Sequence, residues 1–115
     1  MSAGSASPPR VVVAAEAGLS IRAIDDVMVL IGAAYEADAI ILTADDVDAA
    51  FFDLRTGWAG ELFQKATNYG VRLALVLADP AVHGPRWREL AFEHARHPVV
   101  RIVRSRAEAD AWLGV

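Results

Sequence analysis

The chain has 115 residues, of which 55% are hydrophobic, and it carries a formal net charge of −4 at pH 7. This length is typical of a single domain, and an acidic chain without a dense basic stripe is a poor binder of nucleic acid. The absence of cysteine excludes disulfides, thiolate catalysis and zinc sites built on cysteine.

The residues 1–9 are expected to form a short disordered tail before one α/β domain that spans 10–115. The tail lacks the apolar stretch of a signal peptide. No apolar run of the chain reaches the length of about 18 residues that a membrane helix needs. We therefore expect a bacterial, cytoplasmic protein with no membrane partner.

Three elements are predicted in the first third of the chain. The β-branched run Arg10–Ala15 indicates a first strand, and Leu19–Ile21 indicates a short second strand, or an extended entry to the next helix, after a turn. Apolar residues then recur at helical spacing over about Ala23–Ala37. Val29 and Leu30 widen the apolar face of this helix, so we expect the helix to be heavily buried.

The middle of the chain predicts two buried strands separated by an amphipathic helix. The strands are the continuous apolar runs Ala39–Thr43 and Val71–Ala78. The helix spans Gly57–Tyr69 and ends at Gly70, which can adopt the left-handed conformation of a helix stop. Within this helix, Gly60 is expected to permit close packing against a neighbour.

The last third of the chain predicts a helix, a strand and a short helix. Pro85 is a good first residue for a helix that runs to about Arg96. Val99–Arg104 is the last strand, and its arginines are expected to blunt an exposed sheet edge with charge. Ser105 and Glu108 have the spacing of a capping box at the start of the final helix.

The predicted order is β-β-α-β-α-β-α-β-α. Apolar strands that alternate with helices favour a mainly parallel central sheet flanked by helices in one domain. Crossovers between parallel strands are right-handed, so only a few topologies are compatible with this order.

One segment also resembles known families. The sequence FFDLRTGWAGELFQKATNYGVRLALV, which starts at Phe51, resembles the signature of a small bacterial family called domain of unknown function 4180. That resemblance covers nearly the whole chain after the tail and implies a fold without an established activity. A looser resemblance, in Phe51–Gly57, is to STAS domains of the anti-sigma-factor antagonist type, in which the residue before the glycine is a phosphorylated hydroxyl. It implies a STAS-like architecture with Thr56 at the phosphoacceptor position.

Thr56 has two interpretations from its position before Gly57 and an amphipathic run. As a helix N-cap, its hydroxyl accepts a hydrogen bond from an orphan backbone amide. As a functional group, it is phosphorylated or contacts a ligand, because a helix N-terminus tolerates anions well. Arg55 would then pair with the phosphate or with a carboxylate of a partner.

Acidic residues follow two of the predicted strands, at the edge of the sheet where ligands bind in open α/β domains. Asp45, Asp46 and Asp79 could hold a hard cation such as Mg²⁺, with Asp48 and Asp53 nearby. No spacing among them matches a known metal loop, and the other interpretation is a set of capped turns with solvated acids. We expect no cofactor.

Candidates for catalysis are few. His83, in a loop flanked by glycine, is the best candidate for a general base, and Asp53 and Thr56 are weaker catalytic candidates. His94 is expected to pack and His97 to lie at the surface. The chain carries no nucleophile elbow, P-loop or dinucleotide glycine fingerprint. Whether it is an enzyme stays open, with a non-catalytic role favoured.

Two functions remain. The first is a regulatory or protein-interaction module that binds a protein partner or a second copy through the Asp53–Glu61 surface and is switched at Thr56. Its binding residues are Asp53, Arg55, Thr56, Gly57, Trp58 and Glu61. The alternative is a small enzyme or small-molecule-binding protein with a pocket at the strand carboxyl ends. That pocket would be lined by Asp45, Asp53, Arg55, Thr56, Asp79 and His83.

Overall fold

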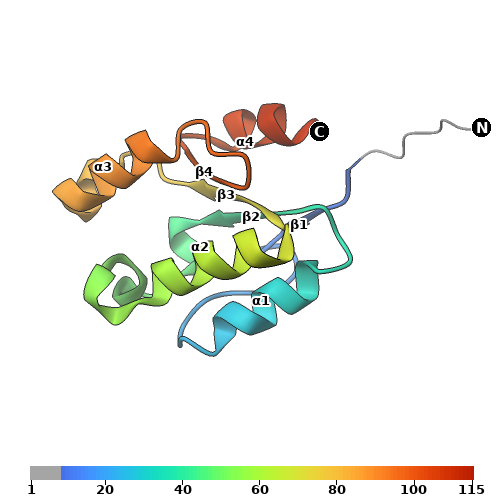
Figure 1. Cartoon of the computed structure of the whole chain (residues 1–115), viewed down its shortest axis with the longest axis horizontal. Coiled ribbons are helices and arrows are strands. Elements are labelled where there is room, and N and C mark those ends of the chain that lie inside the picture. Colours follow the sequence, from blue (N-terminus) through green and yellow to red (C-terminus); the bar gives the residue numbers. More distant parts are fainter. Residues whose placement is uncertain (1–8) are drawn as a thin grey trace, which may run out of the picture.

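A four-stranded parallel sheet forms the centre of the molecule (Figure 1). The computed structural model describes residues 9–115, so the tail predicted for residues 1–9 lies outside the described residues except for the last of them. The strands lie side by side in their chain order: β1 (Val11–Val13), β2 (Ala39–Thr43), β3 (Arg72–Val76) and β4 (Val100–Val103). The predicted α/β class with a mainly parallel sheet is confirmed.

The helices follow the predicted order. They are α1 (Asp26–Ala34), α2 (Trp58–Tyr69), α3 (Pro85–Glu93) and α4 (Arg106–Leu113). Leu19–Ile21 does not form the second strand of the predicted order. It makes only an isolated bridge between Ile21 and Val47, which fits the other interpretation of this segment as an extended entry to the helix. Over residues 9–115, no helix combines the length and the apolar character that crossing a membrane requires.

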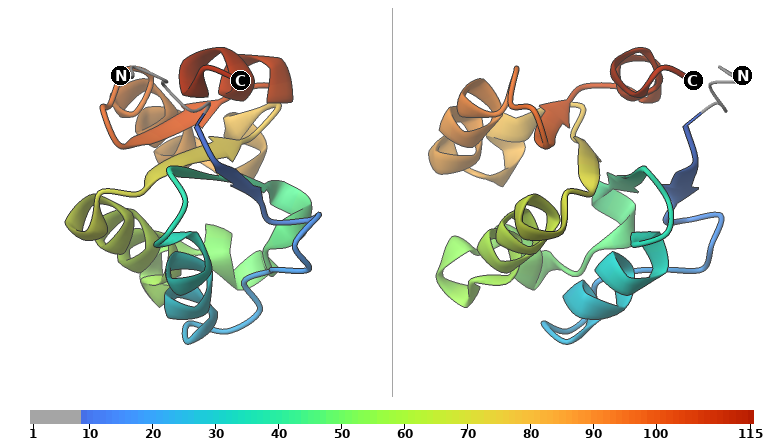
Figure 2. Two further views of the ribbon diagram at one scale, coloured as in Figure 1. Left: turned by 90° about the vertical axis from the view of Figure 1, so that its right-hand side faces the viewer. Right: turned by 45° about the vertical axis from the view of Figure 1, so that its right-hand side comes forward.

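The strand order decides on which face the helices lie. Each crossover moves to the next strand in the same direction, and right-handed crossovers of this kind place their helices on one face of the sheet. Accordingly α1 and α2 lie together on one face, while α4, which follows the last strand, covers the other (Figures 1 and 2). From α3, Trp87 is buried in the same core as α1 and α2.

Alternation along the strands divides the interior into two cores. Residues in register at one level point to the face of α1 and α2, and they are Val12, Ile40, Leu73 and Val100. The neighbouring positions point to α4. On that side the small residues Ala39 and Ala74 lie in one core with Ala109 and Leu113 of α4. Small side chains on the sheet allow this short helix to pack closely against it.

The outer edge of β4 is closed by hydrogen bonds from within the chain. Leu73 and Leu77 donate their N–H groups to the carbonyls of Val99 and Val103, so the even-numbered residues of β4 point their amides away from the sheet. The outward amides, with their acceptors, are Val100 to His97 Nδ1 (3.0 Å), Ile102 to the His94 carbonyl (3.3 Å) and Arg104 to Glu108 Oε2 (2.9 Å).

The predicted position of β4 at the sheet edge is confirmed. Hydrogen bonds within the chain, and not the predicted arginine charges, protect this edge from pairing with a foreign strand. Arg101 places its guanidinium 4.7 Å from the centre of the Trp112 ring, over the face that α4 covers. Half of the predicted capping box is present, because the N–H of Glu108 donates to Ser105 Oγ at 3.1 Å. The side chain of Glu108 does not complete the box but accepts from the backbone N–H of Arg104. Amides that already have acceptors cannot pair with a foreign strand.

The prediction that α1 is heavily buried is only half right. Its inner side packs in the core through Val27, Leu30 and Ile31. On its outer side, Met28 and Val29 are 44% and 58% exposed. The apolar face widens beyond what the sheet and α2 can cover, because a helix on a sheet contacts it along one side only.

His97→Leu tests the closure of the edge. His97 Nδ1 accepts from the N–H groups of Val99 (3.1 Å) and Val100 (3.0 Å), and Val100 is fully buried. We expect the variant to lose about 1–3 kcal/mol of unfolding free energy in denaturant titrations, because buried amides lose their acceptor. His97→Asn, whose side-chain oxygen can accept the same bonds, should lose less. Equal losses in both variants would contradict this role.

Candidate functional site

The predicted site is a turn that leads into α2 and consists of two short 3₁₀ segments, Ala49–Phe52 and Leu54–Thr56. Asp48 begins the first segment and Asp53 the second. Each carboxylate accepts a hydrogen bond from the backbone N–H two residues later, at 3.2 and 3.1 Å. These acids therefore hold the shape of the turn.

Asp53 and Arg55 form a two-pronged ion pair across this turn. Arg55 Nε lies 3.1 Å from Asp53 Oδ1, and Nη2 lies 3.1 Å from Oδ2. Hydrogen bonds from Arg55 lower the pKa of the Asp53 carboxyl below its usual value. A carboxylate that stays ionised and bound at neutral pH is a poor general base. The arginine itself is 91% exposed and faces solvent.

The hydroxyl of Thr56 closes the turn from the other side. Its Oγ1 lies 2.9 Å from the carbonyl oxygen of Ala50 and 2.8 Å from that of Asp53, and it can donate to either. The N-cap of α2 is Gly57, in a left-handed conformation with φ of 81°, and no side chain caps it. Gly57 therefore takes the N-cap position that was predicted for Thr56, although the Thr56 hydroxyl accepts a long hydrogen bond, at 3.4 Å, from the N–H of Trp58, the first residue of α2. Because the chain turns at Gly57, the hydroxyl also points back into the turn.

The acids at the strand ends also serve as local caps. Asp46 is buried and accepts from the backbone N–H and the hydroxyl of Thr43, at 2.8 and 3.0 Å. Asp79 caps the 3₁₀ segment Pro80–His83. The side chain of Asp45 is exposed. Among residues 9–115, no group of three or more histidines and acids is placed to hold a metal ion.

His83 lies in an aromatic cluster that joins the turn to α3. Its ring stacks on Phe52 with the centroids 3.6 Å apart and the planes 6° from parallel. Burial lowers the pKa of His83, and the nearby charge of Asp79 opposes this shift. The ring is therefore neutral at pH 7 and packs as an aromatic side chain.

Trp87 is the centre of this aromatic cluster, which comprises Phe51, Phe52, Phe63, His83 and Trp87. Its ring is buried, and its Nε1 donates to the carbonyl of Phe52 at 2.8 Å. This bond ties α3 to the turn across 35 residues of sequence. The aromatic pair directly before Asp53 was the only local signal for such a contact.

An open groove of about 250 Å³ borders the turn, between α2 and α3. We call it the docking groove, and its lining residues are Leu54, Gly57, Ala59, Gly60, Phe63, Arg86 and Leu90. Gly60 does not serve close packing as predicted, since a Cβ there would meet no atom within 4 Å. Of the remaining predicted binding residues, Trp58 is partly buried against the core, and Glu61 donates its N–H to the Gly57 carbonyl.

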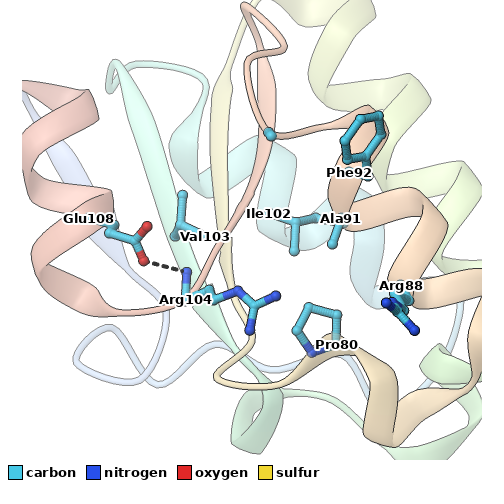
Figure 3. A pocket seen from close by; sticks show the side chains of 9 residues that line it. Pro80, Arg88, Ala91, Phe92, Ile102, Val103, Arg104 and Glu108 are labelled. Carbon is cyan, nitrogen blue, oxygen red and sulfur yellow. Dashed lines mark hydrogen bonds between the residues drawn. The ribbon is translucent and has the colours of Figure 1, made fainter.

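A separate pocket of about 370 Å³ lies between α3 and the end of β4 (Figure 3). Arg88 and Arg104 border it, and Phe92, which is 86% exposed, forms one wall. None of the six residues predicted to line a ligand pocket belongs to it. Sequence reasoning missed this pocket because its arginines had the spacing of solvated surface residues.

Fold and site together define a small parallel α/β domain whose most distinctive turn is held by its own polar side chains. The chain belongs to the family described as Domain of unknown function (DUF4180), whose model matches residues 6–113. The predicted family is thus confirmed. Searches of curated proteins and of solved structures found no match, and the resemblance to STAS domains stays a prediction.

Thr56→Val tests the role of the hydroxyl in the turn. The variant keeps the shape of the side chain and loses the donor to the carbonyls of Ala50 and Asp53. We expect a loss of about 0.5–1.5 kcal/mol of unfolding free energy in denaturant titrations. Thr56→Ser retains the hydroxyl and should remain close to wild type. A Val variant as stable as the Ser variant would show that the hydroxyl does not hold the turn.

His83 should make stability depend on pH. Its pKa in the folded protein lies below the usual 6.5, so the unfolded chain takes up the proton first as the pH falls. The contribution to stability is therefore fully present well above pH 6.5 and is lost as the pH falls from 6.5 through the lower pKa of the folded state. His83→Gln should lose less stability than wild type between about pH 7.5 and 5.5, measured by denaturant unfolding. Part of the loss should persist in the variant, because burial also lowers the pKa of His97. An unaltered loss would refute the role of His83.

Proposed function

We propose that this domain is a non-catalytic protein-interaction module that binds a partner protein through the Asp53–Glu61 segment and the docking groove. One observation carries the proposal. The polar groups of the turn are occupied with one another, whereas the groove beside them is open and mostly apolar. A surface of this kind suits recognition better than proton transfer or nucleophilic attack.

The size of the docking groove supports a side chain as its occupant. Small-molecule sites commonly enclose about 300–1,000 Å³. At about 250 Å³ the groove falls below this range and suits one large apolar side chain of a partner. Gly57 and Gly60 contribute no side chain to its floor, and Leu54 and Phe63 supply apolar walls. A buried apolar anchor surrounded by a polar rim is the usual centre of a protein interface.

Thr56 is well placed to regulate such a surface. A phosphate on its oxygen would remove the donated hydrogen bond and bring negative oxygens against the carbonyls of Ala50 and Asp53. The 3₁₀ segment Leu54–Thr56 would then be displaced, and Leu54 lines the docking groove. Phosphorylation would in this way change the groove without any contact between the phosphate and the partner.

A second candidate function is the binding of a small anionic molecule in the pocket of Figure 3. Its volume of about 370 Å³ lies within the range of ligand sites. Arg88 and Arg104 supply positive charge, and Phe92, Ile102 and Val103 supply apolar contact. Like the alternative function predicted from the sequence, this candidate has a pocket near the carboxyl ends of the strands, but other residues line it.

Gly60→Leu tests the proposed docking groove. A Cβ at this helical position meets no atom within 4 Å, and Gly60 lines the groove, so we expect the new side chain to occupy the groove. The substitution should raise the unfolding free energy by about 0.5–1 kcal/mol, because glycine disfavours the helix. It should also reduce recovery of the partner by about tenfold or more, which corresponds to about 1.4 kcal/mol. The measurement is quantitative affinity capture from a cell lysate with immobilised variants.

Asn68→Leu is the matched control, because it adds the same side chain to an exposed position two turns further along α2. A partner of the docking groove is recovered with wild type and Asn68→Leu and is lost with Gly60→Leu. If no protein shows this pattern, the proposal fails. Thermal stabilisation by small organic anions that disappears in Arg104→Ala would instead favour the second candidate.

A further inference from the structure

Exposed apolar side chains gather on and around α1. Among residues 9–115, eight large apolar side chains are exposed, and five of them belong to this region. They are Ile24, Met28, Val29 and Tyr35, together with Tyr69 of α2. The rings of Tyr35 and Tyr69 meet edge-on with their centroids 6.1 Å apart, so the two helices share one apolar surface. Apolar residues that gather in one area, rather than lying singly, mark an interaction surface.

Two carboxylates lie at the ends of this apolar surface. Asp25 precedes α1 by one residue, and Glu36 follows it by two. They lie four residues before and seven residues after Val29, and these spacings place all three on one side of a helix. Both carboxylates are exposed, and within residues 9–115 neither forms an ion pair. The outward side of α1 therefore carries an apolar stripe with a negative charge at each end.

The wider surroundings of α1 are acidic as well. Residues 16–38 contain five acids and one base, Arg22. The guanidinium of Arg22 is turned to a backbone carbonyl after β2, to which its Nη2 donates at 3.1 Å. On α2, Glu61 and Lys65 precede Tyr69 by eight and four residues, and their opposite charges cancel. An excess of negative charge thus borders the apolar surface.

We propose that this surface binds a basic amphipathic helix of a partner protein. We call it the α1 face, and it consists of the five exposed apolar side chains together with Asp25 and Glu36. The docking groove lies between α2 and α3, so the proposal goes beyond the proposed function and does not depend on it.

A small residue on the α1 face favours a helix as the bound element. Gly32 lies four residues after Met28 and three before Tyr35, and it is exposed. A Cβ built on Gly32 would meet no atom within 4 Å. A small residue between larger apolar ones lets a second helix approach closely. Such a helix presents its own apolar residues at i, i+3, i+4 and i+7, which matches the stripe along α1.

Charge decides which kind of helix fits. A helix with lysine or arginine at both ends of its apolar stripe would pair with Asp25 and Glu36. A second copy of α1 would bring its own two carboxylates against those of the first, whether the helices ran parallel or antiparallel. Like charges at both ends select against that pairing. The α1 face therefore suits a basic partner better than a second copy of this chain.

The first test uses a synthetic helical peptide of about 14 residues, about 20 Å long, with leucine along one side and lysine elsewhere. Its binding to the full chain is measured by fluorescence anisotropy. We expect a dissociation constant of about 100 µM or lower at about 50 mM salt, and binding about threefold or more weaker at about 300 mM salt. The same peptide with glutamate in place of lysine should not bind. Equal binding of the two peptides, or no binding of the lysine peptide, overturns the proposal.

Val29→Gln tests the apolar part of the α1 face. The position is exposed, so circular dichroism should be unchanged, and binding of the lysine peptide should weaken about fivefold. Phe92→Gln, at a position 86% exposed on α3, should bind as wild type. Gly60→Leu, which alters the docking groove, should also bind as wild type, so failure of the two proposals can be told apart. A Val29→Gln variant that binds like Phe92→Gln overturns the proposal.

The double variant Asp25→Asn with Glu36→Gln tests the charged ends of the α1 face. It keeps the shape of both side chains, and the lysine peptide should bind about tenfold or more weakly at about 50 mM salt. Glu89→Gln with Glu93→Gln removes the same charge from the exposed side of α3 and should bind within about twofold of wild type. Equal losses in the two double variants would place the peptide elsewhere and overturn the proposal.

The mass of wild type without peptide, measured by sedimentation, tests the other occupant. We expect a monomer, because the carboxylates of two α1 faces repel one another. A dimer that dissociates in Val29→Gln would show that a second copy covers the α1 face, and it would overturn the proposal.

Discussion

The right-handed crossover between sequential parallel strands is the constraint on which this structure depends. Since β1 to β4 follow one another across the sheet, the connecting helices gather on one side, and only α4 is left for the other. This crowding brings the N-terminal end of α2 close to α3. The turn before α2 and the aromatic cluster that holds it to α3 are consequences of that proximity.

The aromatic cluster converts an exposed turn into a fixed surface. The ring of Trp87 in α3 packs against Phe51 and Phe52, and its Nε1 donates a hydrogen bond to the carbonyl of Phe52, where the first 3₁₀ segment ends. The turn's own polar side chains, including those of Asp53 and Thr56, complete the arrangement. What such a surface offers a partner is shape, because its hydrogen-bonding groups are already used. This is the basis on which we propose an interaction module.

The sequence by itself determined the parallel α/β class, the buried strand Ala39–Thr43 and the stop at Gly70, because these follow from local composition and spacing. The family was predicted from the resemblance of the segment that starts at Phe51. The sequence could also place the candidate turn, though not what its groups do. Only the tertiary structure showed that Thr56 points back into the turn, that His83 stacks on Phe52 and that Val29 is left exposed. These outcomes depend on which distant segments meet. The spacing of apolar residues in a sequence predicts that one face of a helix is apolar. Whether another element covers that face depends on the tertiary contacts.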